Sequence, residues 1–160
     1  MKTAFIAIGL LVWAPTDALA AMAPEIYAEM LAAAPYHVQL EVTARSLIPR
    51  PPGGQEARPG ADPWRGTCTL SGTVERVFRD DAHELDIGEA ISVEVPCEHK
   101  GGPGLVGGVI YSEVEALAAA AYAEVVIDGP PGGPYSVAAH GKGIAILDRA
   151  SEAPVIAVPR

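Results

Sequence analysis

The chain has two cysteines, few aromatic residues (6%) and far fewer basic than acidic residues, with 11 Lys and Arg against 20 Asp and Glu. The acidic excess argues against nucleic acid as a partner, because proteins bind phosphates through basic surfaces that displace counterions. After the first twenty residues, no apolar run approaches the about 20 residues that a membrane-spanning helix needs. We therefore expect a mature chain with no membrane span and no nucleic-acid partner.

Common catalytic and metal-binding motifs are also missing. The histidines form no H-x-x-x-H or H-E-x-x-H motif, and no C-x-x-C is present. The glycine-rich segment 101–108 lacks the Gly-Lys-Ser/Thr end of a phosphate loop, and Ser71 lies in no G-x-S-x-G elbow. The acids of residues 80–86 miss calcium-loop spacing, and Cys97 with His99 would bind a metal only if Cys97 were reduced. We predict a protein that is not an enzyme and holds no metal or cofactor.

The first twenty residues have the layout of a cleaved secretory signal. Met1–Thr3 carries one positive charge, Ala4–Trp13 is an unbroken apolar run, and Pro15 precedes a small-residue exit at Ala18-Leu19-Ala20. The apolar run is too short to span a membrane, and a buried core helix is the alternative. We predict a signal peptide over residues 1–20 and a mature chain that begins at Ala21.

Cysteine usage agrees with export. Cys68 and Cys97 form an isolated pair, which in an oxidising compartment is typical of a disulfide that closes a loop worth about 3–4 kcal/mol in chain entropy. Both cysteines lie in phase with the inward residues of predicted strands. Abundant Ala, Gly and Pro, with no Asn, are typical of a GC-rich bacterial genome. We predict a periplasmic or secreted protein with a Cys68–Cys97 bridge.

The remaining patterns predict a mostly β fold with minor α. An N-terminal helix occupies residues 21–35, a barrel residues 36–148 and a C-terminal tail residues 149–160. Strand phase shifts near Glu75, which predicts a bulge, and Ser112 with Glu115 matches a helix capping box. The expected elements, from apolar periodicity and turn residues, are a helix at 24–34, strands at 37–47, 67–78 and 89–97, a helix at 112–121, a strand at 122–127, and one bent or two short strands over 135–139 and 143–147.

Charge and loop composition indicate where a partner would bind. Asp80–Asp128 holds eleven acids against Lys100, which is either a solvated face or a docking surface for a basic partner. The segment 49–63 is rich in proline and glycine and is predicted to be a long loop. Aromatic residues and arginines at loop edges are common contact residues, although the aromatic ones could instead cover the core. The candidate contacts are Arg50, Arg58, Trp64, Arg65, Tyr111 and Tyr135.

From Tyr36 to Asp148, the order of elements resembles the netrin/metalloproteinase-inhibitor type of oligonucleotide/oligosaccharide-binding (OB) barrel. Residues 72–79 (GTVERVFR) and 87–93 (IGEAISV) are similar to that family's V-x-x-V-F-K-G and G-x-x-I-x-V stretches. The resemblance implies a five-stranded antiparallel barrel with one helix between later strands. The family's inhibitors chelate a protease zinc through an N-terminal cysteine, whereas this mature chain would begin at Ala21, so no functional residue carries over.

Together these observations predict an exported, non-enzymatic binding or interaction module for an unknown protein or small-molecule partner. A small secreted hydrolase or protease inhibitor is the alternative. A cleft in which histidine and carboxylate groups converge would favour an enzyme, and a loop-edged face with exposed aromatic residues would favour a binding module.

The signal-peptide prediction is tested by intact-mass analysis of the exported protein. The mass should correspond to a chain that starts at Ala21, since the small-residue exit places cleavage after Ala20. An exported product that retains Met1 would contradict it.

Overall fold

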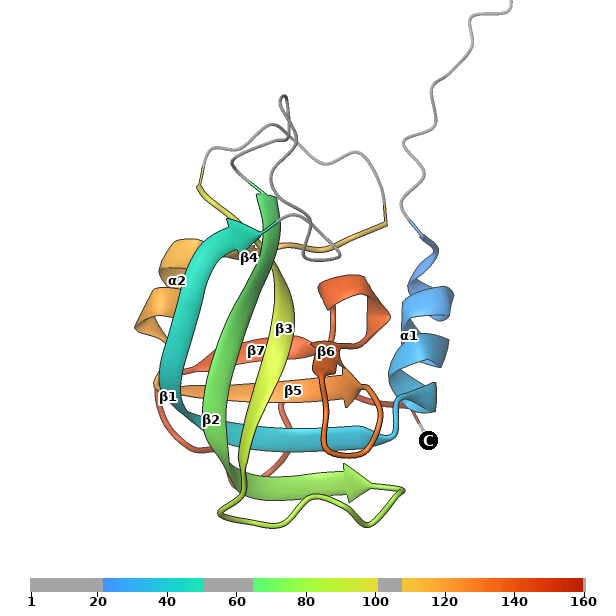
Figure 1. The fold of residues 1–160 in the computed structure, drawn as a ribbon. Coiled ribbons are helices and arrows are strands. Elements are labelled where there is room, and N and C mark those ends of the chain that lie inside the picture. The colour runs from blue at the N-terminus through green and yellow to red at the C-terminus, as the bar shows by residue number, and fades with distance from the viewer. Residues whose placement is uncertain (1–21, 51–64, 101–107, 160) are drawn as a thin grey trace, which may run out of the picture.

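The computed structural model describes residues 22–50, 65–100 and 108–159, apart from the Arg50 side chain. Over these residues the architecture is mostly β, with two helices and one short 3₁₀ turn (Figure 1). In chain order the elements are α1 (Pro24–Ala33), β1 (Tyr36–Arg50), β2 (Arg65–Asp80), β3 (Ala90–Glu98), β4 (Ser112–Glu113), α2 (Val114–Ala119), β5 (Tyr122–Asp128), β6 (Tyr135–Val137), η2 (Ala139–Gly141) and β7 (Ile144–Leu147).

Five strands close into a barrel. β1 pairs with β2, β2 with β3, β3 with β6, β6 with β5, and β5 returns to β1. All of these pairings are antiparallel except β3–β6, which is parallel. This confirms the predicted OB-like, five-stranded barrel with a short helix between its later strands.

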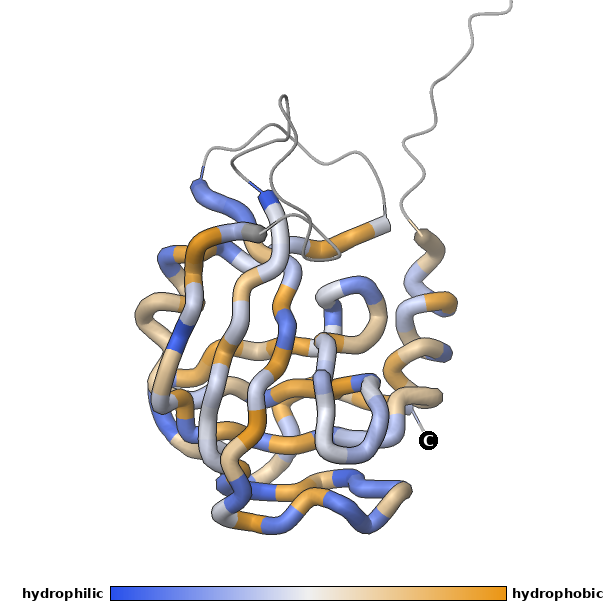
Figure 2. The backbone as a smooth tube through the Cα atoms, viewed as in Figure 1, coloured by the Kyte–Doolittle hydropathy of each residue, from blue (hydrophilic) through white to orange (hydrophobic). Residues whose placement is uncertain are grey.

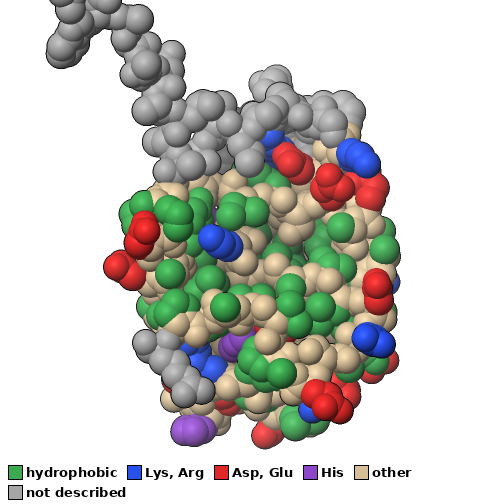
Figure 3. Space-filling view, turned by 180° about the vertical axis from the view of Figure 1, so that it is seen from behind, with side chains coloured by type: hydrophobic (Ala, Val, Ile, Leu, Met, Phe, Trp, Pro, Cys, Tyr) green, Lys and Arg blue, Asp and Glu red, His purple; other side chains and the backbone are tan. Residues whose placement is uncertain are grey.

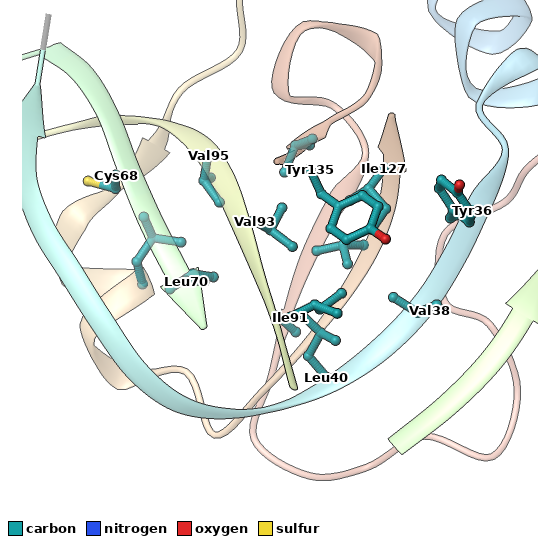
Figure 4. Close-up of a cluster of buried hydrophobic side chains, with 14 of the residues drawn as sticks. Tyr36, Val38, Leu40, Cys68, Leu70, Ile91, Val93, Val95, Ile127 and Tyr135 are labelled. Carbon is teal, nitrogen blue, oxygen red and sulfur yellow. The ribbon is translucent and has the colours of Figure 1, made fainter. Parts of the chain in front are cut away.

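The barrel interior is filled by the alternate residues of its strands. Along β3, exposed and buried residues alternate, and Figure 2 shows the matching alternation of hydropathy. Ile91, Val93 and Val95 point inward as predicted (Figure 4). At Gly72 of β2, a Cβ atom would lie 2.5 Å from the Glu41 carbonyl oxygen, so only glycine fits where β1 crosses close by.

Bulges bend the two longest strands. Gln39 of β1 pairs with Arg76 of β2, while Leu40 pairs with Val74, so Glu75 has no opposite residue in β1. This confirms the bulge predicted near Glu75. Similar register shifts occur at three other points of the β1–β2 ladder. An extra residue kinks and twists its strand, which gives β1 the curvature seen in Figure 1.

The last predicted strand is two short strands. β6 and β7 lie along the edge of β5 that β1 does not occupy, and η2 separates them. Val126 holds both ends of the interruption, because its N–H donates to Gly143 O (2.7 Å) and its carbonyl accepts from Ala138 N–H (2.9 Å).

The helix α1 forms where it was predicted and packs outside the barrel, but it buries Tyr27 and Leu31, while Ile26, expected on its apolar face, is exposed. Pro24 occupies its first turn, and Tyr27 and Leu31 are buried against Val126 and η2. The Arg79 guanidinium of β2 donates to the carbonyl oxygens of Leu31 and Ala32, which complements the helix C-terminus. Within the described ranges, neither helix is long and apolar enough to cross a membrane.

The predicted capping box of the second helix is wrong. Ser112 and Glu113 form β4, paired in parallel with Cys97 and Glu98, so α2 begins at Val114 and has no side-chain cap. Strand pairing places Ser112 one residue before the N-cap position, which Glu113 occupies. The helix also ends earlier than expected, at Ala119.

The C-terminal end of α2 is capped by a cation from another element. The Arg45 guanidinium of β1 donates to the carbonyl oxygens of Leu117 and Ala120. The Leu117 carbonyl also accepts the Ala120 N–H at 3.3 Å. The arginine adds a charged donor to these C-terminal carbonyls and complements the negative end of the helix dipole.

The predicted disulfide is present. Cys68 of β2 and Cys97 of β3 are both fully buried and bonded, with their Cα atoms 5.7 Å apart. The bridge joins two neighbouring strands at the end of the barrel where β1 ends and β2 begins.

Replacing both cysteines by alanine should lower the free energy of unfolding by about 3–4 kcal/mol, because the denatured chain regains the entropy of a loop of this length. Urea unfolding without reductant measures the loss. Because both sulfurs are buried, wild-type protein unfolded in urea without reductant should show no thiol in an Ellman titration, and two titratable thiols would refute the bridge.

Candidate functional site

A groove of about 370 Å³ lies between β3 and the turn that connects β5 to β6. We call it the β3 groove; one wall is the outward face of β3 with Thr69 of β2, and the other is the turn ending at Tyr135. Figure 1 shows this turn beside β3. β6 pairs with β3 only at Val93 and Glu94, so the preceding β3 residues face the groove.

The turn depends on glycine. Gly129 has a φ of +149°, and a Cβ atom there would lie 2.5 Å from the Pro134 carbonyl oxygen. Gly132 and Gly133 also have positive φ, and the Gly133 N–H donates to Pro130 O at 2.9 Å. Positive φ costs glycine little, so this sequence folds back tightly and stands over the groove.

The groove wall is acidic. Glu94 of β3 is exposed and Glu89 half-buried. Thr69 lies opposite Glu94 in the β2–β3 ladder, and Ser92 also lines the groove, with its hydroxyl 2.7 Å from that of Ser71. The Glu89 carboxylate accepts an N–H from Asp86 at 3.2 Å, which orients it. The described lining residues include no Lys, Arg or His. This arrangement is complementary to a cationic, hydrogen-bonding ligand.

The floor of the groove is Tyr135, one of the predicted contact residues. Its side chain is 3% exposed and packs edge-on against Tyr36 with ring centroids 5.5 Å apart, as Figure 4 shows. The prediction left open a contact residue or a core residue, and the structure places it in the core. No hydrogen bond of ordinary geometry to its hydroxyl exists within the described ranges.

Acidic groups surround both tyrosine hydroxyls. Burial raises the pKa of Tyr36 to about 12, and its hydrogen bond to Glu84 (3.0 Å) adds to the increase, together with nearby Asp80. Burial also raises the pKa of Tyr135, with the Gly132 amide opposing this and nearby carboxylates reinforcing it. Both phenols are therefore neutral at neutral pH.

Two other predicted contact residues meet at the opposite end of β3. Arg65 donates to Glu98 at 2.8 Å, and its guanidinium lies 5.3 Å from the centroid of the Tyr111 ring. The structure thus brings Arg65 and Tyr111 together, away from Tyr135. Arg58, Trp64 and the Arg50 side chain lie outside the described residues.

Apart from Tyr135, the sequence did not single out the residues of the β3 groove. Glu89 and Glu94 belong to the acidic block Asp80–Asp128, which had been interpreted either as a solvated face or as a docking surface. Strand alternation placed the Glu94 side chain opposite the inward residues, whereas Glu89 is in phase with them and lies just before β3 begins. The turn that covers both is distant in sequence.

One histidine and one carboxylate do converge, and His37 lines a hollow of about 390 Å³ beside the C-terminal segment, although Glu124 does not reach it. His37 Nε2 lies 2.9 Å from Glu124 Oε1, and the two side chains are 5% and 0% exposed beneath the C-terminal segment. No group of three His, Cys, Asp or Glu residues suited to a metal occurs among the described residues. Cys97 is in the disulfide, so it cannot join His99 in a metal site.

No protein family, curated protein or solved structure matches this chain. The resemblance to netrin-type barrels therefore remains a prediction, and the function must be argued from the site itself.

The raised tyrosine pKa values predict a loss of stability at high pH. A folded-state pKa above the unfolded value of about 10 stabilises the fold below pH 10 and stops doing so as pH rises through 12. Urea unfolding between pH 9 and 12 should therefore show falling stability, with a shallower fall in Tyr36→Phe. An identical slope in both proteins would show that Tyr36 contributes nothing.

Proposed function

We propose that this chain is an exported, non-enzymatic binding module that holds a basic, extended segment of a partner protein in the β3 groove. The observation that carries the proposal is the pair of carboxylates, Glu89 and Glu94, on a wall whose described residues offer no cation. The disulfide is consistent with an oxidising compartment, which supports export.

The size and shape of the groove support a peptide segment. A volume of about 370 Å³ is at the small end of ligand pockets and holds a few side chains. A complex between two globular surfaces instead uses a broad, flat contact area. Serine and threonine hydroxyls can accept or donate hydrogen bonds to a peptide backbone, while the carboxylates select Lys or Arg side chains.

The charge of the whole chain supports the same partner. A net charge of −9 steers basic molecules toward the surface and speeds their encounter at low salt. Binding through the β3 groove should weaken as ionic strength rises, because exposed charge pairs are screened.

The test measures binding of a fluorescein-labelled arginine-rich peptide by anisotropy, with an equally long glutamate-rich peptide as probe control. Glu89→Gln with Glu94→Gln should weaken binding about 3- to 10-fold, the range for two partly exposed charge pairs. The matched control is Glu113→Gln with Glu115→Gln, which removes the same charge from exposed positions outside the groove.

Equal losses in both double variants would show that total charge, not the groove, attracts the peptide. Unchanged binding in the Glu89 and Glu94 variant would refute the groove as the binding site.

A further inference from the structure

The outer face of β1 and β5 carries buried polar side chains that face away from the barrel core. Gln39 and Glu124 are directly opposite each other in the β1–β5 ladder, and both are fully buried. His37 is 4% exposed and pairs with Glu124. Burying a carboxylate is costly unless its oxygens receive hydrogen bonds, so this surface requires donors from outside the barrel.

Residues 150–159, which we call the C-terminal strap, supply these donors. Glu124 accepts the N–H groups of Val155 (2.8 Å) and Ile156 (2.6 Å). Gln39 contacts Ser151 twice, donating to its carbonyl at 3.0 Å and accepting its N–H at 2.7 Å. Every one of these hydrogen bonds is to the strap's main chain, so the polar part of the recognition reads its backbone.

Few side chains of the strap are buried. Residues 152–155 are exposed, with Val155 56% exposed, and no helix or strand forms within it. Only Ile156 and Val158 pack, half-buried, against the cluster around α1. Figure 1 shows the chain passing behind the barrel to end near α1, and Figure 3 shows that face, where hydrophobic side chains alternate with backbone and uncharged polar groups. Segments with few buried contacts open at low free-energy cost.

The surface that binds the strap, formed by His37, Gln39 and Glu124, is positioned by contacts within the barrel that do not involve the strap. Gln39 and Glu124 are positioned by strand pairing, and Glu124 is oriented by His37. When the strap leaves, the Glu124 carboxylate loses its backbone donors, and any segment that presents two successive N–H groups replaces them. The same segment of another copy has the required chemistry.

We propose that the outer face of β1 and β5 is a peptide-backbone-binding site, distinct from the β3 groove, and that it accepts the C-terminal strap of a second copy of this chain. In a single copy the chain's own strap occupies the site, since tethering gives it an effective concentration of about millimolar. Binding of one copy's strap to another copy can be detected when one copy has a defective strap and the other has a defective binding surface.

The test mixes two full-length variants. In the first, Val155→Pro with Ile156→Pro removes both strap N–H groups and leaves the receiving surface intact. In the second, Glu124→Gln removes the carboxylate and leaves the strap intact. Glu124→Leu, which removes both acceptor oxygens, replaces it should Glu124→Gln fail to fold, as judged by circular dichroism. Both proteins are mixed at about 1 mM, the range of the tethered concentration, and analysed by native mass spectrometry and light scattering.

The mixture should contain a 1:1 heterodimer, and each variant alone should be monomeric. The matched control replaces the first variant by Ala157→Pro, which keeps the two N–H groups that Glu124 binds; its own strap fills its site, so its mixture should stay monomeric. A monomeric mixture of the two folded variants would overturn the proposal. A heterodimer that also forms with the Ala157→Pro control would place the interface elsewhere and overturn it equally.

Discussion

Barrel closure depends on β1, which pairs with β2 along its length and with β5 along its first half. A straight strand could not serve both neighbours, so the bulges opposite it in β2 and within it are required by the fold. With β1 bent, β3 and β6 come together at the far side, and their short parallel contact leaves the β3 groove open.

The same strand also sets the two faces of the molecule. Its inward residues, such as Val38 and Leu40, belong to the main core, while its outward residues His37 and Gln39 meet the C-terminal strap. The outer face of β5 is likewise covered, by the strap at Glu124 and by α1 at Val126. β5 is therefore buried on both faces, although a strand with antiparallel neighbours usually has one face in water.

The parts of this fold that follow from local periodicity could be predicted from the sequence. Alternation along residues 89–97 placed Ile91, Val93 and the disulfide cysteine on one face, and the phase shift revealed the bulge at Glu75. What failed depended on distant partners. Ser112 matches the capping pattern, yet it pairs with β3 as part of a strand. The acids of the β3 groove line a groove only because a turn about forty residues later packs beside them.

The Cys68–Cys97 bond has a consequence for how this chain varies among related genes. It fastens β2 to β3 at the end where segments 51–64 and 101–107 join the barrel, so the strands that carry these segments are tied together independently of them. Closure entropy grows only slowly with loop length. Insertions, deletions and composition drift should therefore accumulate in these two connections, which gives selection a region to diversify while the scaffold stays constant.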